Sequence, residues 1–375
     1  MNRPTMLILS FSPIAADARV LKQVQEFTKD HDVVTCGYGD APDGVTEHIR
    51  LWGDPPVDPP NGRLITLRQR RIAFWMLPGV RAARAALRGR RFDVAIANDV
   101  EAVAVASELE PRAGVLADLH EYSPRLHEEH APWMRHIAPY VRLLVRRYVR
   151  RAQAWTTVGE GIAAEFEREF GFRPEVVTNA APFREGEPRP VGTPLRLVHS
   201  GAGLRNRRLE ETITAVAEVP GATLDLYLTR NHPDYIAELR ELAARAEGRV
   251  RVLDPVPYRE LTERLADYDV GVFLLPPENF SYLWALPNKL FDYVQARLGV
   301  VVGPSPEMAR LVQEHGLGVV AEGFDAQDLA EALRSLTAAD VEAYKRAAHA
   351  AARELSAERQ VAVWRRIIDR MEGRT

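Results

Sequence analysis

The chain has 375 residues, which is more than one hydrophobic core usually supports, so two domains are expected. Its 46% hydrophobic and 27% charged residues are typical of a globular protein and exclude the disordered and fibrous classes. The net charge of -3 gives no reason to expect a nucleic-acid partner, and the single cysteine excludes a disulfide within the chain.

The first half alternates short apolar runs with helix-length segments. The run at 5–10 precedes a helix predicted over about 17–29 and a second apolar run at 32–36, which is the pattern of a β-α-β unit. Further strands are predicted at 93–98, 114–120, 154–159 and 175–179. Such continuous apolar strands suit a parallel sheet covered on both faces. We therefore expect a Rossmann-like domain over residues 1–185.

A linker and a second domain follow. Residues 186–194 are rich in proline, glycine and charge, which is typical of a linker. Strands are then predicted at 195–201, 222–228, 249–256, 269–275, 299–303 and 317–323. We expect a second Rossmann-like domain at 195–350, which binds the nucleotide, and a helical segment at 351–375 that can return to the first domain. The predicted fold class is α/β, with two Rossmann-like domains facing each other across a cleft that holds the active site.

The most informative segment is 284–320, WALPNKLFDYVQARLGVVVGPSPEMARLVQEHGLGVV. Pro287 is expected to begin a helix whose free backbone N–H groups, beside Asn288 and Lys289, suit a diphosphate. Asp292 lies one helical turn after Lys289, where its carboxylate can accept hydrogen bonds from ribose hydroxyls. A surface helix with a Lys289–Asp292 ion pair explains the residues equally well.

Two further segments carry candidate residues. Residues 197–216, LVHSGAGLRNRRLEETITAV, predict a strand, a turn at Gly201, a basic cluster and a helix. Taken alone, the arginines of that cluster are better explained as solvated surface residues. Residues 118–124, DLHEYSP, place His120 and Glu121 at the carboxyl end of an apolar strand, where polar groups face a ligand. On an extended chain the two side chains would point to opposite faces.

Together these segments resemble the GT-B glycosyltransferases of family 4. The resemblance implies a retaining hexosyltransferase that takes a nucleotide diphosphate sugar as donor substrate and needs no metal and no cofactor. It implies that Asp292 holds the donor ribose and that Lys289 and Asn288 bind the donor diphosphate. Arg207 stands six residues after Gly201, where the similar enzymes place a base that neutralises the leaving diphosphate.

The resemblance also assigns the remaining positions. It implies that His120, with Glu121 beside it, acts at the donor sugar as the catalytic pair. Trp284 stands where the family has its first glutamate, so the loop 276–286, through Ser281 or Tyr282, is the candidate for holding the transferred sugar. Ala202 stands where the family has a second basic residue, so Arg205 or Arg208 would have to compensate.

Two more contacts are expected from position. The turn 253–257 lies where similar enzymes read the nucleobase through backbone groups, which makes Val256 the candidate there. Residues 12–20 replace a glycine-rich acceptor loop and leave Asp17 and Arg19 as acceptor-side contacts, although Asp17 is equally well explained as a helix N-cap.

Arginine-rich stretches bear on location and acceptor. Residues 63–91 hold nine arginines and no acid, and residues 131–155 hold six and no acid. Basic amphipathic helices bind anionic bilayers, and solvated arginines from a coding bias are an equal alternative. We expect a cytoplasmic protein, with contact to the inner face of the membrane left open, and a glycan, glycolipid or small-molecule acceptor. Two alternatives for function also stay open, a catalytically inactive GT-B partner subunit and a nucleotide-sugar epimerase.

Overall fold

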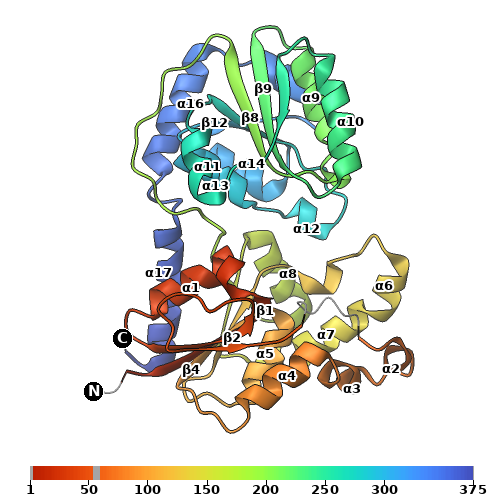
Figure 1. The fold of residues 1–375 in the computed structure, drawn as a ribbon, viewed down its shortest axis with the longest axis vertical. Helices are drawn as coiled ribbons and strands as arrows, with labels where there is room; N and C mark the ends of the chain where they lie inside the picture. The colour runs from red at the N-terminus through yellow and green to blue at the C-terminus, as the bar shows by residue number, and fades with distance from the viewer. Residues whose placement is uncertain (1–2, 54–59, 375) are drawn as a thin grey trace. The chain divides into compact units, whose positions relative to one another are not determined.

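A computed structural model describes residues 3–53 and 60–374 (Figure 1). The chain divides into two compact units. Unit 1 runs to Thr178 and also includes the residues from Gln360 onward, and unit 2 is Asn179–Arg359. The sequence placed these boundaries at 185 and 351. Within the described residues, 183–194 form neither helix nor strand, and they belong to unit 2.

Unit 1 is built on a seven-stranded parallel sheet in the order β3-β2-β1-β4-β5-β6-β7. The strands are β1 (Thr5–Pro13), β2 (Asp32–Tyr38), β3 (Glu47–Arg50), β4 (Val94–Asn98), β5 (Val115–Leu119), β6 (Ala154–Thr157) and β7 (Glu175–Val176). Its α-helices are α1 (Ala18–Phe27), α2 (Gly62–Thr66), α3 (Arg70–Trp75), α4 (Pro78–Leu87), α5 (Asp99–Ser107), α6 (Ala131–His136), α7 (Ala138–Arg147) and α8 (Glu160–Phe170). The last helix, α17 (Ala357–Glu372), buries Trp364 and Ile367 in the same core as Met6 and Ile8 of β1.

Unit 2 repeats this plan with a six-stranded parallel sheet in the order β10-β9-β8-β11-β12-β13. The strands are β8 (Leu195–Ala202), β9 (Ala222–Thr229), β10 (Val250–Leu253), β11 (Val270–Phe273), β12 (Gly299–Val302) and β13 (Gly318–Val320). The α-helices are α9 (Leu209–Ala217), α10 (Pro233–Ala244), α11 (Tyr258–Leu265), α12 (Phe280–Leu283), α13 (Asn288–Gln295), α14 (Pro306–His315), α15 (Ala326–Arg334) and α16 (Ala338–Ala351).

The strand order fixes where each unit can bind a ligand. In both sheets the first strand of the unit lies between the second and the fourth, so the direction of winding reverses there. Open parallel sheets bind ligands at the carboxyl ends of the strands beside such a reversal. Ligand-binding sites are therefore expected at the carboxyl ends of β1 and β4 in unit 1 and of β8 and β11 in unit 2. No helix among the described residues is long and apolar enough to cross a membrane.

Candidate functional site

Two side chains of unit 2, those of Lys289 and His199, meet at Gly201, near the end of β8. A Cβ atom at Gly201, whose φ is +152°, would lie 2.5 Å from Lys289 Nζ and 3.8 Å from His199 Nε2. Lys289 reaches this point from the first turn of α13, and its Nζ stands 4.0 Å from the centre of the Phe273 ring at the end of β11. The absence of a side chain at Gly201 therefore lets the Lys289 ammonium group approach the backbone near the end of β8, beside the first turn of α13.

The site is electropositive. Burial, together with the positive charge of Arg207, lowers the pKa of Lys289 to about 7, against the opposing effect of Asp292. Arg207 lies in a short 3-10 turn, with its guanidinium 4.5 Å from the centre of the Tyr282 ring. Within the described part of the chain, neither Lys289 nor Arg207 has a carboxylate within ion-pair distance. The Lys289–Asp292 ion pair of the alternative interpretation is therefore not formed, and two cations are left for an anionic ligand.

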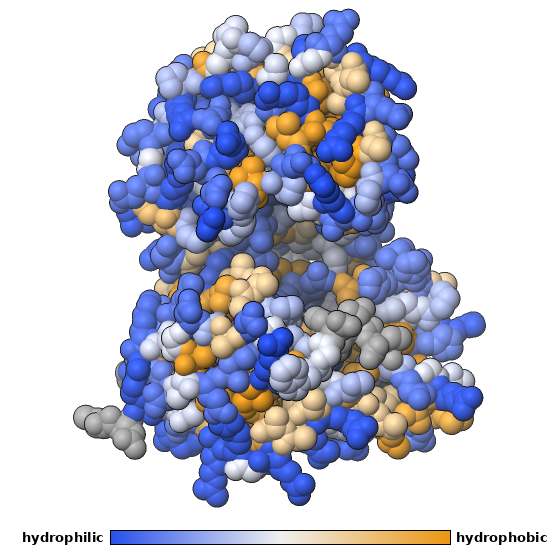
Figure 2. Space-filling model, in the orientation of Figure 1, coloured by the Kyte–Doolittle hydropathy of each residue, from blue (hydrophilic) through white to orange (hydrophobic). Residues whose placement is uncertain are grey.

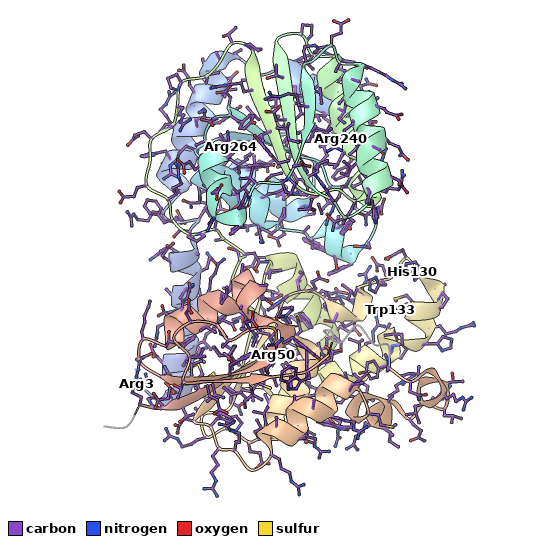
Figure 3. The ribbon with its side chains drawn as sticks, viewed as in Figure 1. Arg3, Arg50, His130, Trp133, Arg240 and Arg264 are labelled. Carbon is purple, nitrogen blue, oxygen red and sulfur yellow. The ribbon has the colours of Figure 1, made fainter. Side chains whose placement is uncertain are left out.

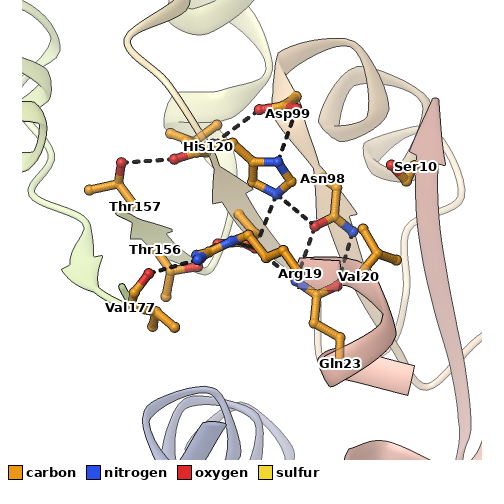
Figure 4. Close-up of polar contacts among 12 residues, drawn as sticks. Ser10, Arg19, Val20, Gln23, Asn98, Asp99, His120, Thr156, Thr157 and Val177 are labelled. Carbon is orange, nitrogen blue, oxygen red and sulfur yellow. Dashed lines mark hydrogen bonds and ion pairs between the residues drawn. The ribbon is translucent and has the colours of Figure 1, made fainter. Parts of the chain in front are cut away.

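In unit 1 a buried carboxylate organises the ends of β4 and β5 (Figure 4). Asp118 of β5 accepts hydrogen bonds from Arg19 (2.6 and 2.8 Å), Gln23 (2.7 Å) and Thr156 (2.6 Å). Burial alone would raise the pKa of Asp118, but Arg19 and His120 outweigh it, and the pKa lies well below its usual range. Asp118 is thus a fixed negative charge beneath His120.

His120 lies between two carboxylates. Its Nε2 is 3.4 Å from Asp118 and 3.2 Å from the Asn98 side-chain oxygen, and its Nδ1 is 3.5 Å from Asp99. Burial acts to lower the pKa of His120, but the charges of Asp99 and Asp118 prevail and raise it. These contacts are long for charge-assisted hydrogen bonds, so a ligand hydroxyl can compete for the imidazolium.

Comparison with known proteins assigns this arrangement to a family. Residues 19–182 match the model described as Glycosyltransferase Family 4, and residues 195–339 match the model described as Glycosyl transferases group 1. The chain belongs to the GT-B glycosyltransferases. The expected class, a nucleotide-sugar glycosyltransferase of the GT-B type, is confirmed at the level of the family. No curated protein sequence matches the chain closely enough to stand as a relative.

Several solved structures are similar to this chain over nearly its full length. Sucrose-phosphate synthase from Thermosynechococcus elongatus has a TM-score of 0.74 at 14% identity, with both chains covered completely. HepE of Anabaena in complex with UDP has a TM-score of 0.70 at 14% identity, covering 97% of this chain and 99% of that one. HepE in complex with UDP-glucose has a TM-score of 0.68 at 15% identity, covering 99% and 100%. At such identities the likeness shows the fold, and the predicted pair of parallel-sheet α/β domains is confirmed.

The two arginines expected to compensate for Ala202 form ion pairs within unit 2. Arg205 pairs with Glu238 at 2.5 Å, and Arg208 pairs with Glu211. Their role at the diphosphate stays a prediction. Lys289, which comes from a different element, supplies the second positive charge beside Gly201.

Tyr258, which the sequence did not indicate, connects the predicted ribose-binding residue Asp292 with the predicted nucleobase position at Val256. Pro287 is the N-cap of α13 rather than its first helical residue, and Asn288 is exposed beside it. Asp292 is buried and accepts a hydrogen bond from the Tyr258 hydroxyl at 3.3 Å. Tyr258 begins α11 two residues after Val256, which is partly buried in the turn that follows β10.

The loop before α13 is joined to the basic turn. Tyr282 of α12 accepts a hydrogen bond from the Asn206 side chain at 2.7 Å, and its ring packs against Arg207. The Ser281 hydroxyl is buried and has no hydrogen-bond partner among the described residues. The structure thus places Tyr282 next to Arg207, where it orients that guanidinium, and leaves the Ser281 oxygen unsatisfied.

His199 is the other residue that sequence reasoning missed. Its side chain is buried in β8, Nδ1 donates to the Val272 carbonyl at 3.0 Å, and Nε2 has no partner among the described residues. Burial and the charges of Lys289 and Arg207 hold its pKa well below the usual value, so the imidazole is neutral. A buried, unpartnered nitrogen beside two cations indicates a polar ligand. The only signal in the sequence was a histidine in an otherwise apolar strand, two residues before a glycine.

The expected roles in unit 1 change in two respects. Arg19 is buried, with its guanidinium bonded to Asp118 and to the Val177 carbonyl and placed over the Trp364 ring, so it supports Asp118 rather than facing a cavity. Asp17 caps α1 by accepting from the backbone of Arg19 and Val20. β5 ends at Leu119, so the alternation expected for the next two residues does not apply. Both of those residues, His120 and Glu121, line one cavity.

Proposed function

We propose that this glycosyltransferase takes a UDP-hexose as donor and holds it in unit 2 around Gly201. The observation that carries the proposal is that Lys289 and His199 meet at Gly201, at the strand-order reversal, with the charge of Arg207 acting on both. Among the described residues, neither cation has a carboxylate within ion-pair distance. A diphosphate would neutralise these two charges. The choice of uridine is supported by the HepE complexes, which contain UDP and UDP-glucose.

The proposed reaction breaks the bond between the anomeric carbon and the β-phosphate oxygen. The acceptor hydroxyl oxygen forms the new glycosidic bond, the bonding electron pair leaves with the diphosphate, and the hydroxyl proton passes to a diphosphate oxygen. Lys289, Arg207 and the N-terminus of α13 stabilise the charge that grows on the leaving group. Attack from the face that the diphosphate leaves retains the anomeric configuration.

The other residues have supporting roles in this proposal. Asp292 accepts hydrogen bonds from the ribose hydroxyls, and Tyr258 positions that carboxylate. The backbone near Val256 contacts the uracil, and Ser281 contacts the transferred sugar. His120 donates to a sugar hydroxyl, and the charges of Asp99 and Asp118 raise the pKa of its imidazole. Independence from metal, a cytoplasmic location and contact with a membrane stay predictions.

Thermal unfolding with nucleotides tests the donor site. UDP at a hundred times its dissociation constant should stabilise unit 2 by about 2.7 kcal/mol, a shift of several degrees. We expect this shift to disappear in Lys289→Ala and in Arg207→Ala. Arg205→Ala is the matched control, because that guanidinium is already paired with Glu238, and it should keep the shift.

The outcome also separates the alternatives. No stabilisation by UDP, GDP, ADP or dTDP would overturn the donor assignment, and equal losses in all three variants would show a general effect of charge. An epimerase would convert UDP-glucose without an acceptor, and an inactive partner subunit would bind UDP without turnover. Neither is favoured by the family assignment. Product NMR of the anomeric proton then tests retention.

A further inference from the structure

Unit 1 contains a cavity of about 470 Å³ at the carboxyl ends of β1 and β4, beside His120. One side of it is polar, and the other is formed by apolar side chains of α4, α6 and α7. The apolar side includes Leu77, Val80, Trp133, Ile137 and Val141. A volume of this size suits a small organic ligand. Its two-sided lining suits a ligand with one polar end and one apolar end.

The polar side carries acids. Asp17, Asp99, Glu101 and Glu121 line the cavity, and the basic residues among the described lining are two histidines. One of these, His120, is already held between Asp99 and Asp118. An anionic ligand would meet several carboxylates and find no arginine or lysine among these lining residues. A neutral ligand avoids that cost.

Two polar groups of the cavity can bind a ligand hydroxyl. The Tyr140 hydroxyl on α7 is buried and unpartnered among the described residues, and the residue is only 2% exposed. Buried polar groups are nearly always satisfied in the working state of a protein. The Glu101 carboxyl on α5 lines the same cavity, where burial and the nearby Asp99 raise its pKa to about 7, against the opposing effect of a hydrogen bond from its own backbone. A ligand hydroxyl can accept from Tyr140, which satisfies that phenol, and donate to Glu101.

The apolar side continues beyond this cavity. A second cavity of about 410 Å³ shares Trp133 and Ile137 with the first and is otherwise lined by residues of α2 and α6, including Ile65 and Pro132. Trp133, which is labelled in Figure 3, therefore lines both cavities. Apolar surface (orange) is interspersed with hydrophilic side chains on this unit (Figure 2), and Leu67, Ile72 and Met76, around α3, are exposed. The two cavities together can hold an apolar body longer than one ring.

We propose that this cavity is the acceptor site and that the acceptor is a neutral amphiphile, with hydroxyl groups at Glu101, Tyr140 and His120 and an apolar body against Trp133 and Ile137. The inference rests on the proposed transferase function and narrows its acceptor class. Phosphorylated sugars and other anionic acceptors are excluded by the acids of the polar side. Glu101 and Tyr140 are specificity residues in this scheme, since they satisfy the acceptor hydroxyl away from the reacting centre.

Calorimetric titration without donor tests the inference on the full-length protein. The probes are n-octyl β-D-glucoside below its micelle concentration, D-glucose, and D-glucose 6-phosphate. We expect octyl glucoside to bind at least tenfold more tightly than glucose. Glucose 6-phosphate, titrated into Lys289→Ala so that the donor site does not hold its phosphate, should bind more weakly than glucose. Tyr140→Phe and Glu101→Gln should each weaken octyl glucoside binding about five- to tenfold. Trp133→Ala should weaken it further.

Tyr148→Phe is the matched control, because it removes a phenol hydroxyl from the end of α7, away from the lining of this cavity. The inference is overturned if octyl glucoside binds no better than glucose, if the phosphate binds best, or if Tyr140→Phe behaves like Tyr148→Phe. If Glu101→Gln does not fold, the affinity of Tyr140→Phe for octyl glucoside decides whether the inference holds. The amphiphile titration contains no donor, so the two proposals fail separately. If octyl glucoside does not bind as expected but UDP still stabilises the protein, only this inference is refuted. If octyl glucoside binds as expected but UDP does not stabilise the protein, only the donor assignment is refuted.

Discussion

Donor binding should weaken as the pH rises above 7, because Lys289 must be charged to hold a diphosphate. In the free protein, burial and Arg207 lower the pKa of Lys289 to about 7. A bound diphosphate favours the ammonium form, so the pKa returns toward its ordinary value of 10.5 and a proton is taken up on binding. Between pH 7 and pH 9 the affinity for UDP-glucose should fall by up to about tenfold per unit, or ~1.4 kcal/mol.

The proton uptake can be counted by calorimetry at pH 8 in two buffers with different ionisation enthalpies. UDP-glucose is the right ligand because its diphosphate does not titrate in this range. The wild type should take up about 0.9 proton at pH 8, as a pKa near 7 requires. Lys289→Arg should take up almost none, since a guanidinium stays charged. Arg207→Ala should take up less than the wild type, because loss of that charge raises the pKa of Lys289. No uptake by the wild type, or equal uptake by Lys289→Arg, would refute the reasoning.

Four further results are expected. Gly201→Ala should abolish the stabilisation by UDP, since its Cβ would lie 2.5 Å from Lys289 Nζ. The free energy of unfolding without ligand should fall by far less than this lost stabilisation. A variant that UDP still stabilises would contradict the proposed donor site. Arg19→Met should lower the free energy of unfolding by about 3–5 kcal/mol in urea, because it leaves the buried Asp118 charge without its ionic partner; a loss below 1 kcal/mol would count against that role. His120→Ala should reduce kcat about 100-fold and leave the dissociation constant of UDP unchanged. Turnover of UDP-glucose should be the same with and without EDTA, and an EDTA-sensitive rate would end the metal-free proposal.

The strands were largely predictable because they are buried on both faces and read as continuous apolar runs. β3 was missed, since Glu47–Arg50 is a short edge strand with charged residues at both ends and no apolar run. β7 was predicted as five residues and has two. Its only partner is β6, which ends at Thr157, so no neighbour remains to pair with the rest of the run.

The candidate site was less accessible from sequence. The segments around Gly201 and Lys289 were found separately, but only the fold shows that α13 brings the ammonium group within contact of the β8 turn. His199 depends on the same fact, because its partner is the carbonyl of Val272 on the neighbouring β11. Arg19 was assigned by position near an expected acceptor loop. Its burial follows from Asp118, which is 99 residues away in the chain.

The charges of the two units suggest how donor and acceptor are told apart. In unit 2, Lys289 and Arg207 lack carboxylate partners among the described residues, so a diphosphate gains from binding there. In unit 1, Arg19 is paired with Asp118 and does not line the cavity, which presents Asp99 and three other acids. A phosphorylated sugar would therefore be attracted to the donor site and repelled by the acceptor cavity. Under the two proposals, that asymmetry disfavours an anionic acceptor in the unit 1 cavity and favours neutral hydroxyl compounds there.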